Sequence, residues 1–260
     1  MMRKPFIAAN WKMNKLVEES VEYGETLVEK LKAEKVDLKK VDVAVCVPFI
    51  HMAALKVIFV LRNINVGAQN MHYEESGAYT GEISPAMLKD MGIECVIIGH
   101  SERRMYFGET DEACARKVSA AHASGIRPIL CVGESLAQRE AEAHFSTVKT
   151  QLTGCFAGVG REEAAKTVIA YEPVWAIGTG MVATPQSAQD AAKAIRDDLS
   201  ATFGSHVGEA VRILYGGSVS SKNAVELIGE PDVDGFLIGG AALHVDELTR
   251  ICQLTIEATL

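Results

Sequence analysis

Apolar residues recur along the chain in eight short runs that are rich in valine, isoleucine and leucine. Strands with one face in water alternate apolar and polar residues, whereas near-continuous apolar runs are typical of a parallel sheet covered on both faces. We therefore predict eight buried parallel strands, which cover residues 6–10, 41–47, 64–68, 95–99, 126–132, 167–171, 211–215 and 235–239.

The segments between these runs have helical features. Thr184 is a candidate N-cap, and Pro185 follows it at the first helical position, where a backbone N–H is not needed. Ser84 and Pro85 repeat this opening. Beyond Pro185, one apolar stripe at helical spacing is formed by Ala188, Ala192, Ile195 and Leu199. The pattern thus predicts a strand followed by a helix, repeated along the chain.

Repeated strand–helix units fold in two main arrangements, a closed (β/α)8 barrel and an open doubly wound sheet. The even number of strands and the absence of a GxGxxG motif after the first strand favour the barrel. The chain has 260 residues and contains no linker or low-complexity segment. We expect an α/β fold, a (β/α)8 TIM barrel, that forms a single domain over residues 1–260.

Residues 69–84 form the longest predicted irregular segment. This segment is too long for an ordinary connection between a strand and a helix. Inserted loops of this size are usually functional. We expect residues 69–84 to act either as a lid or as a contact with another chain.

Composition and charge restrict the partners. The formal net charge of −8 disfavours a diffuse nucleic-acid or anionic-membrane surface, because those partners require a positive field. Any anionic ligand must therefore be held by local donors. The six cysteines include no CxxC pair, and the N-terminal apolar run is too short for a signal peptide. We expect reduced thiols in a cytoplasmic protein with no membrane or nucleic-acid partner.

Residues just beyond the C-terminal ends of the strands gather around one mouth in a (β/α)8 barrel. In this chain, these positions supply a carboxylate, an imidazole, an ammonium group and glycine-rich turns. The candidate site residues are Asn10, Lys12, His100, Glu172, Ser218, Gly239 and Gly240. Together they predict a site that combines acid–base chemistry with anion binding.

The charged candidates each have a functional and a structural interpretation. Glu172 could serve as a general base or be a solvated loop carboxylate. A neutral His100 at the start of a short helix could donate its N–H to a carbonyl oxygen, but a single histidine is more often structural. Lys12 could reach into the mouth or keep its ammonium group in water. No pair of histidines has HxxxH spacing, so a metal site is the weakest option.

Two Gly-Gly pairs, at residues 216–217 and 239–240, follow the last two predicted strands. Glycine lets backbone N–H groups approach a phosphate closely, although strand-to-helix turns also use glycine for their geometry. Barrels commonly hold phosphate after the seventh and eighth strands. The position of these pairs therefore favours a phosphate site.

Six segments resemble the triosephosphate isomerase family, in the same order and at the same spacing along nearly the full chain. They are residues 9–14 (ANWKMN), 67–84 (GAQNMHYEESGAYTGEIS), 99–104 (GHSERR), 170–180 (AYEPVWAIGTG), 215–219 (YGGSV) and 234–243 (DGFLIGGAAL). The segment over residues 170–180 is highly specific for this family.

The resemblance implies an isomerase that interconverts dihydroxyacetone phosphate and D-glyceraldehyde 3-phosphate without a cofactor, through a cis-enediol(ate), in glycolysis and gluconeogenesis. It implies that Glu172 moves the proton between C1 and C2, while neutral His100 polarises the carbonyl. Lys12 would bind substrate and stabilise negative charge. Glu102 matches the second carboxylate of the family, so the resemblance implies that it is also a catalytic residue, with a role in orienting Lys12. The remaining substrate-binding residues that the resemblance implies are Asn10, Gly178, Ser218, Gly239 and Gly240.

The resemblance also implies a homodimer, because residues 69–84 match the segment with which family members contact a neighbouring subunit, with Thr80 directed toward the partner's site. Cys131 matches a family cysteine near the catalytic glutamate, and we interpret it as a small buried side chain. The chain departs from the family pattern at Met181 and Val182. These positions form the far hinge of a lid in the family, so the departure concerns lid closure and not proton transfer.

Two alternatives stay open. Another phosphate-binding barrel enzyme, such as an aldolase, would need a Schiff-base lysine at a strand end, for which Lys12 is the only candidate in this set. An inactive homologue that serves in binding would be expected to have lost Lys12, His100 or Glu172, and all three are present.

Overall fold

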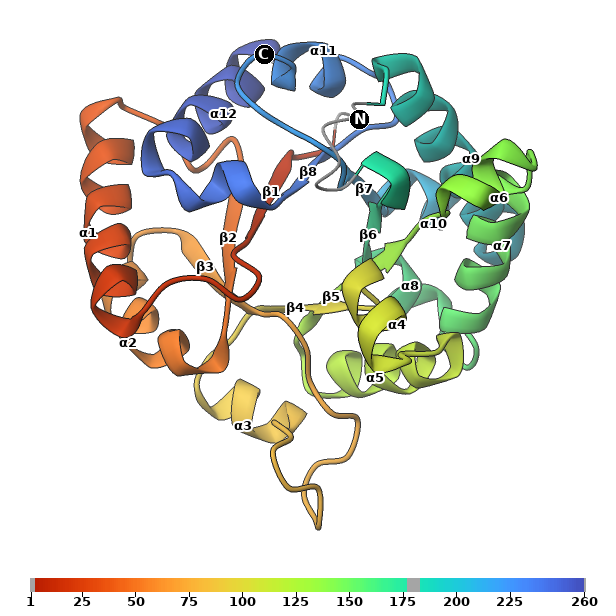
Figure 1. The fold of residues 1–260 in the computed structure, drawn as a ribbon, viewed down its shortest axis with the longest axis horizontal. Helices are drawn as coiled ribbons and strands as arrows, with labels where there is room; N and C mark the ends of the chain where they lie inside the picture. Colours follow the sequence, from red (N-terminus) through yellow and green to blue (C-terminus); the bar gives the residue numbers. More distant parts are fainter. Residues whose placement is uncertain (1–2, 177–182, 260) are drawn as a thin grey trace.

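Eight parallel strands form one closed sheet, in the sequential order β1 to β8 (Figure 1). The computed structural model describes residues 3–176 and 183–259. Within these residues all eight predicted strands are confirmed, and the (β/α)8 TIM-barrel fold is therefore also confirmed. The strands are β1 Phe6–Asn10, β2 Asp42–Val47, β3 Ile64–Ala68, β4 Cys95–Ile98, β5 Arg127–Val132, β6 Val168–Tyr171, β7 Arg212–Tyr215 and β8 Gly235–Ile238.

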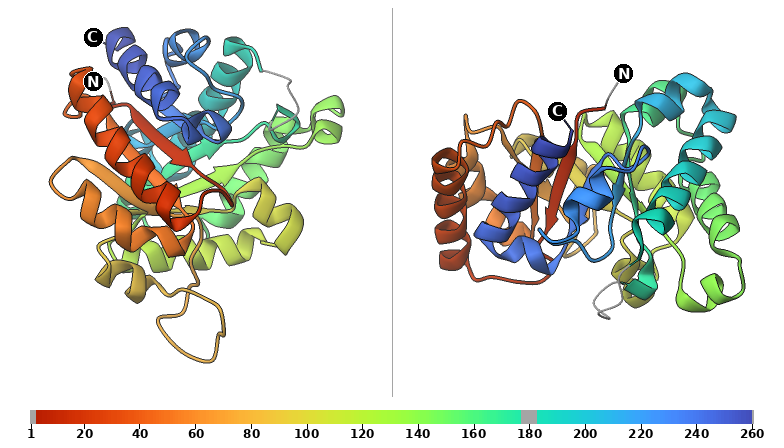
Figure 2. Two further views of the ribbon diagram at one scale, coloured as in Figure 1. Left: turned by 60° about the vertical axis from the view of Figure 1, so that its left-hand side comes forward. Right: turned by 90° about the horizontal axis from the view of Figure 1, so that it is seen from above.

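Helices form an outer layer around the barrel, as the views in Figures 1 and 2 show. The 3-10 helices η1 Val174–Ala176 and η2 Gly240–Leu243 follow β6 and β8. In the described part of the chain, no helix combines the length and apolarity that crossing a membrane requires. The α-helices are α1 Val17–Ala33, α2 Phe49–Phe59, α3 Pro85–Asp90, α4 Ser101–Phe107, α5 Asp111–Ala123, α6 Leu136–Glu140, α7 His144–Cys155, α8 Arg161–Lys166, α9 Pro185–Phe203, α10 Ser205–Ala210, α11 Ala224–Ile228 and α12 Val245–Ala258.

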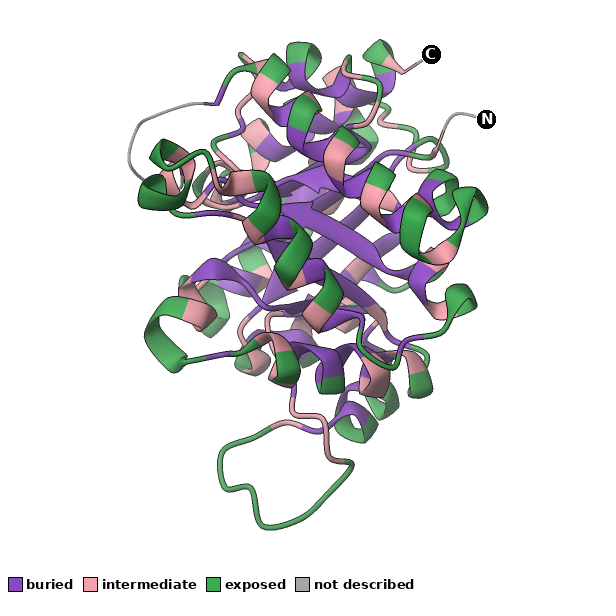
Figure 3. Ribbon diagram, turned by 90° about the vertical axis from the view of Figure 1, so that its right-hand side faces the viewer, coloured by how far each residue is buried: buried purple, intermediate pink, exposed green. Residues whose placement is uncertain are grey.

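The strands are buried on both faces (Figure 3). Side chains that point outward join the helices in one large apolar cluster. Those that point into the barrel form a second cluster, made up of Phe6, Ala8, Ala44, Cys46, Cys95, Ile97, Ile129, Cys131, Val168, Ala170, Leu214 and Leu237. Because neither face meets water, the strands have no alternation of polar and apolar residues.

The predicted helix starts are present. Thr184 caps α9, since its hydroxyl oxygen accepts a hydrogen bond from Ser187 N at 3.1 Å. Ser84 caps α3 in the same way and accepts from Met87 N at 3.2 Å. The predicted apolar stripe of α9 is buried against the barrel, at Ala188, Ala192, Ile195 and Leu199.

Residues 69–84 leave the barrel as a long loop that extends outward beyond the helices (Figures 1 and 3). Contacts between tilted aromatic rings support the loop internally. The His72 ring centroid lies 4.2 Å from that of Tyr73 and 4.3 Å from that of Tyr79. Residues 75–82 are exposed. Within one chain, the loop is thus ordered by its own side chains and leaves its tip uncovered.

Closure of the barrel requires glycine at position 235. Phe6 of β1 pairs with Gly235 of β8, and a Cβ atom on Gly235 would lie 2.0 Å from Phe6 O. The φ angle of Gly235, +144°, adds backbone strain for any other residue. Gly158 offers a matched comparison, because its φ is +82° but no atom lies within 4 Å of the position that a Cβ would take.

We predict that Gly235→Ala lowers the free energy of unfolding by roughly 3 kcal/mol or more, because the clash and the strain act together. The control Gly158→Ala introduces strain alone and should lose about 1–2 kcal/mol. Chemical denaturation followed by circular dichroism measures both variants. If both variants lost the same free energy of unfolding, the close approach of residue 235 to Phe6 O would not limit closure of the barrel.

Candidate active site

The C-terminal ends of the strands bring most of the predicted residues to one end of the barrel. Asn10 is the last residue of β1, His100 lies just beyond β4, and Glu172 follows β6 directly. A cavity of about 250 Å³ opens at this end, and its lining includes Asn10, Lys12, Gln69, His100, Glu102 and Phe107. The predicted gathering of strand ends is therefore present in the fold.

Glu172 and His100 are in direct contact. His100 Nε2 lies 3.0 Å from Glu172 Oε1, and both side chains are buried, with 6% of His100 and 2% of Glu172 exposed. The other oxygen of the carboxylate, Oε2, accepts a hydrogen bond from Ser101 N at 2.9 Å. Sequence reasoning missed this contribution of Ser101, because a backbone N–H leaves no signal in the residue type. The carboxylate is thus held at both oxygens, from the start of α4.

The helix α4 determines which imidazole nitrogen of His100 carries the proton. His100 is the N-cap of this helix, and its Nδ1 accepts a hydrogen bond from Glu102 N at 3.2 Å. Glu102 Oε2 is farther away, at 3.6 Å from the same nitrogen, which is beyond a good hydrogen bond. A neutral imidazole whose Nδ1 accepts must carry its proton on Nε2. The protonated nitrogen is therefore the one that lies 3.0 Å from Glu172 Oε1.

Two glycines make room for Glu172. A Cβ atom on Gly133 would lie 1.7 Å from Glu172 O, and one on Gly216 would lie 3.0 Å from Glu172 Cγ. The backbone of Glu172 also donates to Val132 O at 2.7 Å. The position of the carboxylate therefore depends on residues at the ends of β5 and β7. Gly133 was not singled out from the sequence, where it resembles any glycine that ends a strand.

Lys12 lies beside the histidine and is oriented by several contacts. Its Nζ is 2.7 Å from Glu102 Oε1, and its backbone N–H donates to Asn10 Oδ1 at 3.0 Å. The backbone of Lys12 has a φ of +52°, which is uncommon for a residue with a side chain. Gln69 Nε2 donates to Lys12 O at 2.9 Å. Gln69 was considered in the sequence only as part of the long loop, so its role in the site was missed.

Ser218, Gly239 and Gly240 follow β7 and β8, and we call them the anion cradle. Gly239 is the N-cap of η2, and Gly240 is its first residue. The Nζ of Lys12 lies 3.9 Å from the position that a Cβ atom on Gly239 would take. Lys12 therefore connects the imidazole side of the mouth to the cradle. Gly178, Met181 and Val182, which were predicted to take part in the site or its lid, lie outside the described residues.

Cys131 lies inside the barrel near Glu172 and is fully buried. Burial, followed by the nearby Glu172 carboxylate, raises the pKa of this thiol well above its usual value of 9.0. The thiol is therefore neutral over the physiological range. These observations agree with the interpretation of Cys131 as a small buried side chain.

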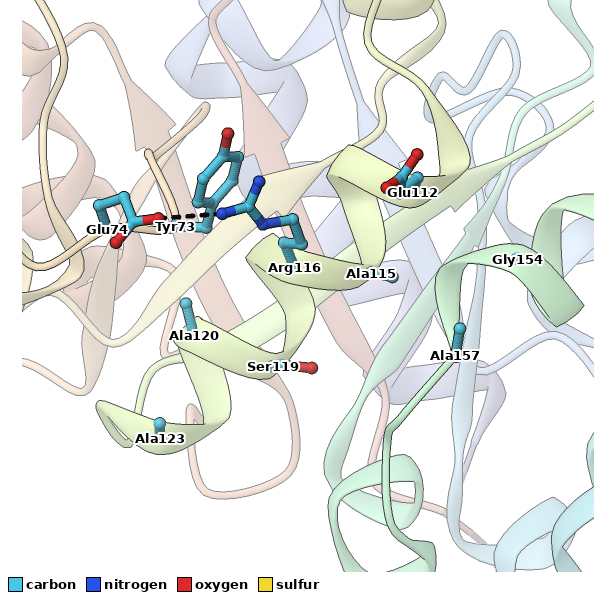
Figure 4. A pocket seen from close by; sticks show the side chains of 10 residues that line it. All are labelled: Tyr73, Glu74, Glu112, Ala115, Arg116, Ser119, Ala120, Ala123, Gly154 and Ala157. Carbon is cyan, nitrogen blue, oxygen red and sulfur yellow. Dashed lines mark hydrogen bonds and ion pairs between the residues drawn. The ribbon is translucent and has the colours of Figure 1, made fainter. Parts of the chain in front are cut away.

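A second cavity, of about 670 Å³, lies away from the mouth, between the base of the 69–84 loop and helices α5 and α7 (Figure 4). The Arg116 guanidinium lies 3.5 Å from the Tyr73 ring centroid and pairs with Glu74 at 2.9 Å. The rest of the lining consists mainly of alanine, glycine and serine. Among the described residues, no group of three or more histidine, cysteine or acidic residues could hold a metal ion. The mouth is therefore the better candidate for chemistry.

The fold and the mouth together are those of a (β/α)8-barrel enzyme, with a carboxylate, an imidazole and an ammonium group gathered at the strand ends. The chain belongs to the triosephosphate isomerase family, whose sequence profile matches residues 5–255. The triosephosphate isomerase of Bifidobacterium adolescentis is 52% identical over 259 residues, which cover 99% of this chain and 98% of the relative. That of Carboxydothermus hydrogenoformans is 51% identical over 252 residues, with 97% and 99% covered. That of Alkaliphilus oremlandii is 50% identical over 250 residues, with 96% and 99% covered.

We predict that none of the six thiols reacts with an aromatic disulfide reagent in the native protein at pH 8, because all six cysteines are free and buried. All six should react after unfolding in guanidinium chloride. A raised pKa disfavours the thiolate, so Cys131 should stay unreactive as the pH approaches 9.0. Absorbance of the released thiolate counts the reacting groups. Rapid reaction of one thiol in the native state would show that the structure around that thiol opens to solvent.

Proposed function

We propose that this protein interconverts D-glyceraldehyde 3-phosphate and dihydroxyacetone phosphate, which is the reaction of the triosephosphate isomerase family. The observation that carries the proposal is the contact of 3.0 Å between Glu172 and His100 at the barrel mouth, with Lys12 beside them. Members of this family need no cofactor, and the reaction moves a proton between two carbon atoms without net oxidation. The same enzyme would serve glycolysis and gluconeogenesis.

Glu172 is the base in this proposal. The proton on a carbon next to a carbonyl is weakly acidic, so its removal needs a base in contact with it and stabilisation of the oxygen. In this structure, the carboxylate lies against His100 Nε2 and Ser101 N. To reach a substrate carbon, Glu172 must leave both donors. That movement would free the Nε2–H of His100 for the substrate oxygen.

Lys12 and Glu102 act on the same oxygen side of the substrate. The Lys12 ammonium group would stabilise the negative charge of the enediolate, and the pair distance of 2.7 Å supports a role for Glu102 in orienting Lys12. Asn10 accepts from Lys12 N at 3.0 Å and would line the pocket. Because the protein as a whole is acidic, this local cation supplies the attraction for an anionic substrate.

The anion cradle would bind the phosphate. Gly239 and Gly240 carry no side chain that could shield their N–H groups, and they lie at the start of η2. Ser218 is exposed at the end of β7. Gly178 remains a predicted further donor.

An aldolase with a larger substrate is the less favoured alternative. Lys12 is paired with Glu102 and held at the rim of a cavity of about 250 Å³. This volume suits a small substrate, since sites for drug-sized ligands start at about 300 Å³. Assaying the activity of the wild type tests the second alternative, an inactive homologue.

The barrel also supports the proposal that residues 1–260 act as one domain, and the six free thiols support a cytoplasmic location.

We predict that Glu172→Gln keeps the fold but lowers kcat by roughly 10²–10⁴-fold or more, because the amide cannot accept the carbon-bound proton. A coupled assay with D-glyceraldehyde 3-phosphate, without added metal or cofactor, measures the wild type and the variant together. Circular dichroism checks that the variant is folded. Wild-type activity that persists in Glu172→Gln would exclude Glu172 as the base, and an inactive wild type would support the binding-protein alternative.

A homodimer is the second part of the proposal. Met13 and Phe107 line the mouth cavity but are 94% and 70% exposed in one chain, which is unusual for large apolar side chains beside a binding site. The outward loop of residues 69–84 is the segment proposed to cover them in a second subunit, with Thr80 directed toward the neighbouring site. Both features would be explained if each loop covered the mouth region of the other subunit.

We predict that Met13→Glu shifts the protein from dimer to monomer, because the new charge would be buried without a partner in the interface. Leu61→Glu is the matched control, since Leu61 is equally exposed, at 94%, but lies beyond the end of α2 and does not line the mouth cavity. Sedimentation velocity measures the oligomeric state of both variants. A Met13→Glu variant that sediments like the wild type would contradict an interface at the mouth.

A further inference from the structure

Tyr23 of α1 reaches across the structure to η2. Its hydroxyl donates to Ala242 O at 2.6 Å, between residues that are 219 positions apart in the sequence. Tyr23 is 4% exposed and Ala242 is fully buried. Burial raises the pKa of Tyr23 far above its usual value of 10.0, so the phenol keeps its proton and remains a donor. This hydrogen bond ties α1 to the segment that begins with Gly239 and Gly240.

The η2 segment needs such external support. It has four residues, and a 3-10 helix of this length has few internal hydrogen bonds to define its orientation. One of them runs from Ala242 N to Gly239 O at 2.9 Å. Ala242 therefore bonds to Gly239 through its N–H and to Tyr23 through its carbonyl. The directions of the N–H groups of the anion cradle depend on this chain of contacts.

The ring of Tyr23 supports the segment that follows the neighbouring strand, β1. It packs edge-on against Trp11, with 4.8 Å between ring centroids, and Trp11 directly precedes Lys12. The Nζ of Lys15 lies 4.7 Å from the Tyr23 ring centroid and 5.3 Å from that of Trp11. Tyr23 thus has two separable functions in the structure. Its hydroxyl contacts η2, and its ring contacts the segment that carries Lys12.

We propose that Tyr23 is a positioning residue for phosphate binding, which it serves by holding η2 through Ala242 O. The proposal rests on the assignment of Ser218, Gly239 and Gly240 as the phosphate site. Tyr23 itself does not touch the substrate. Removing the hydroxyl would leave Ala242 O buried without a partner, and η2 would shift to satisfy it.

The test is Tyr23→Phe, which removes the hydroxyl and keeps the ring against Trp11. We expect KM for D-glyceraldehyde 3-phosphate to rise roughly tenfold, with little change in kcat, because the lost interaction acts on a phosphate that is bound equally in ground and transition states. The Kd of inorganic phosphate, measured by titration calorimetry, should rise by the same factor. Both measurements are made at a temperature at which circular dichroism shows the variant to be folded.

Phe156→Leu is the matched control for lost stability. The Phe156 ring packs against Phe203 at 5.4 Å between centroids, in the contact between α7 and α9, so its loss should lower the melting temperature without changing KM or the phosphate Kd. Tyr23→Leu removes ring and hydroxyl together and should lower kcat as well, through Lys12. An unchanged phosphate Kd in Tyr23→Phe would overturn the positioning role. Phosphate binding does not depend on turnover, so an inactive wild type would refute the proposed function separately.

Discussion

Hydrogen bonds between β1 and β8 close the sheet, and the rest of the molecule depends on that closure. Phe6 N donates to Asp234 O at 2.9 Å, just before the two strands pair. A parallel sheet closed in this way has no free edge, and all its strands run in one direction. Their C-terminal ends must therefore meet at one mouth. The contact between Glu172 and His100, which follow non-adjacent strands, is a consequence of this geometry.

The strands and the helix starts could be predicted because their signals are local. Burial on both faces requires consecutive apolar residues, as in 167–171, and the cap at Thr184 needs only its own hydroxyl and the following proline. Residues just beyond the C-terminal ends of barrel strands were expected to share one mouth, and Lys12, His100 and Glu172 do lie there. The partners of these residues could not be predicted in the same way. Every residue type except proline has an N–H like that of Ser101, and the contact of Tyr23 with Ala242 depends on how distant elements pack.

The carboxylate of Glu172 has two partners at the mouth, His100 Nε2 and Ser101 N. A hydrogen bond to a charged group is worth about 1.5–3 kcal/mol. The bond from Ser101 N and the contact with His100 Nε2 would both have to be exchanged for contacts with substrate. Binding of the phosphate, far from the reacting carbons, can offset this cost if it drives the rearrangement of the mouth. If this exchange of contacts takes place as substrate binds, its cost and the contribution of the cradle both appear in KM and not in kcat.

The fold restricts which residues can occupy position 133. Every single-nucleotide change in a glycine codon that alters the residue adds at least a Cβ atom or stops the chain. At Gly133 that atom would lie 1.7 Å from Glu172 O. A lineage that carries this barrel therefore cannot vary the position by small steps, although Gly133 has no side chain and no role in proton transfer. Selection that maintains Glu172 as the base must therefore also maintain a residue without a side chain at position 133.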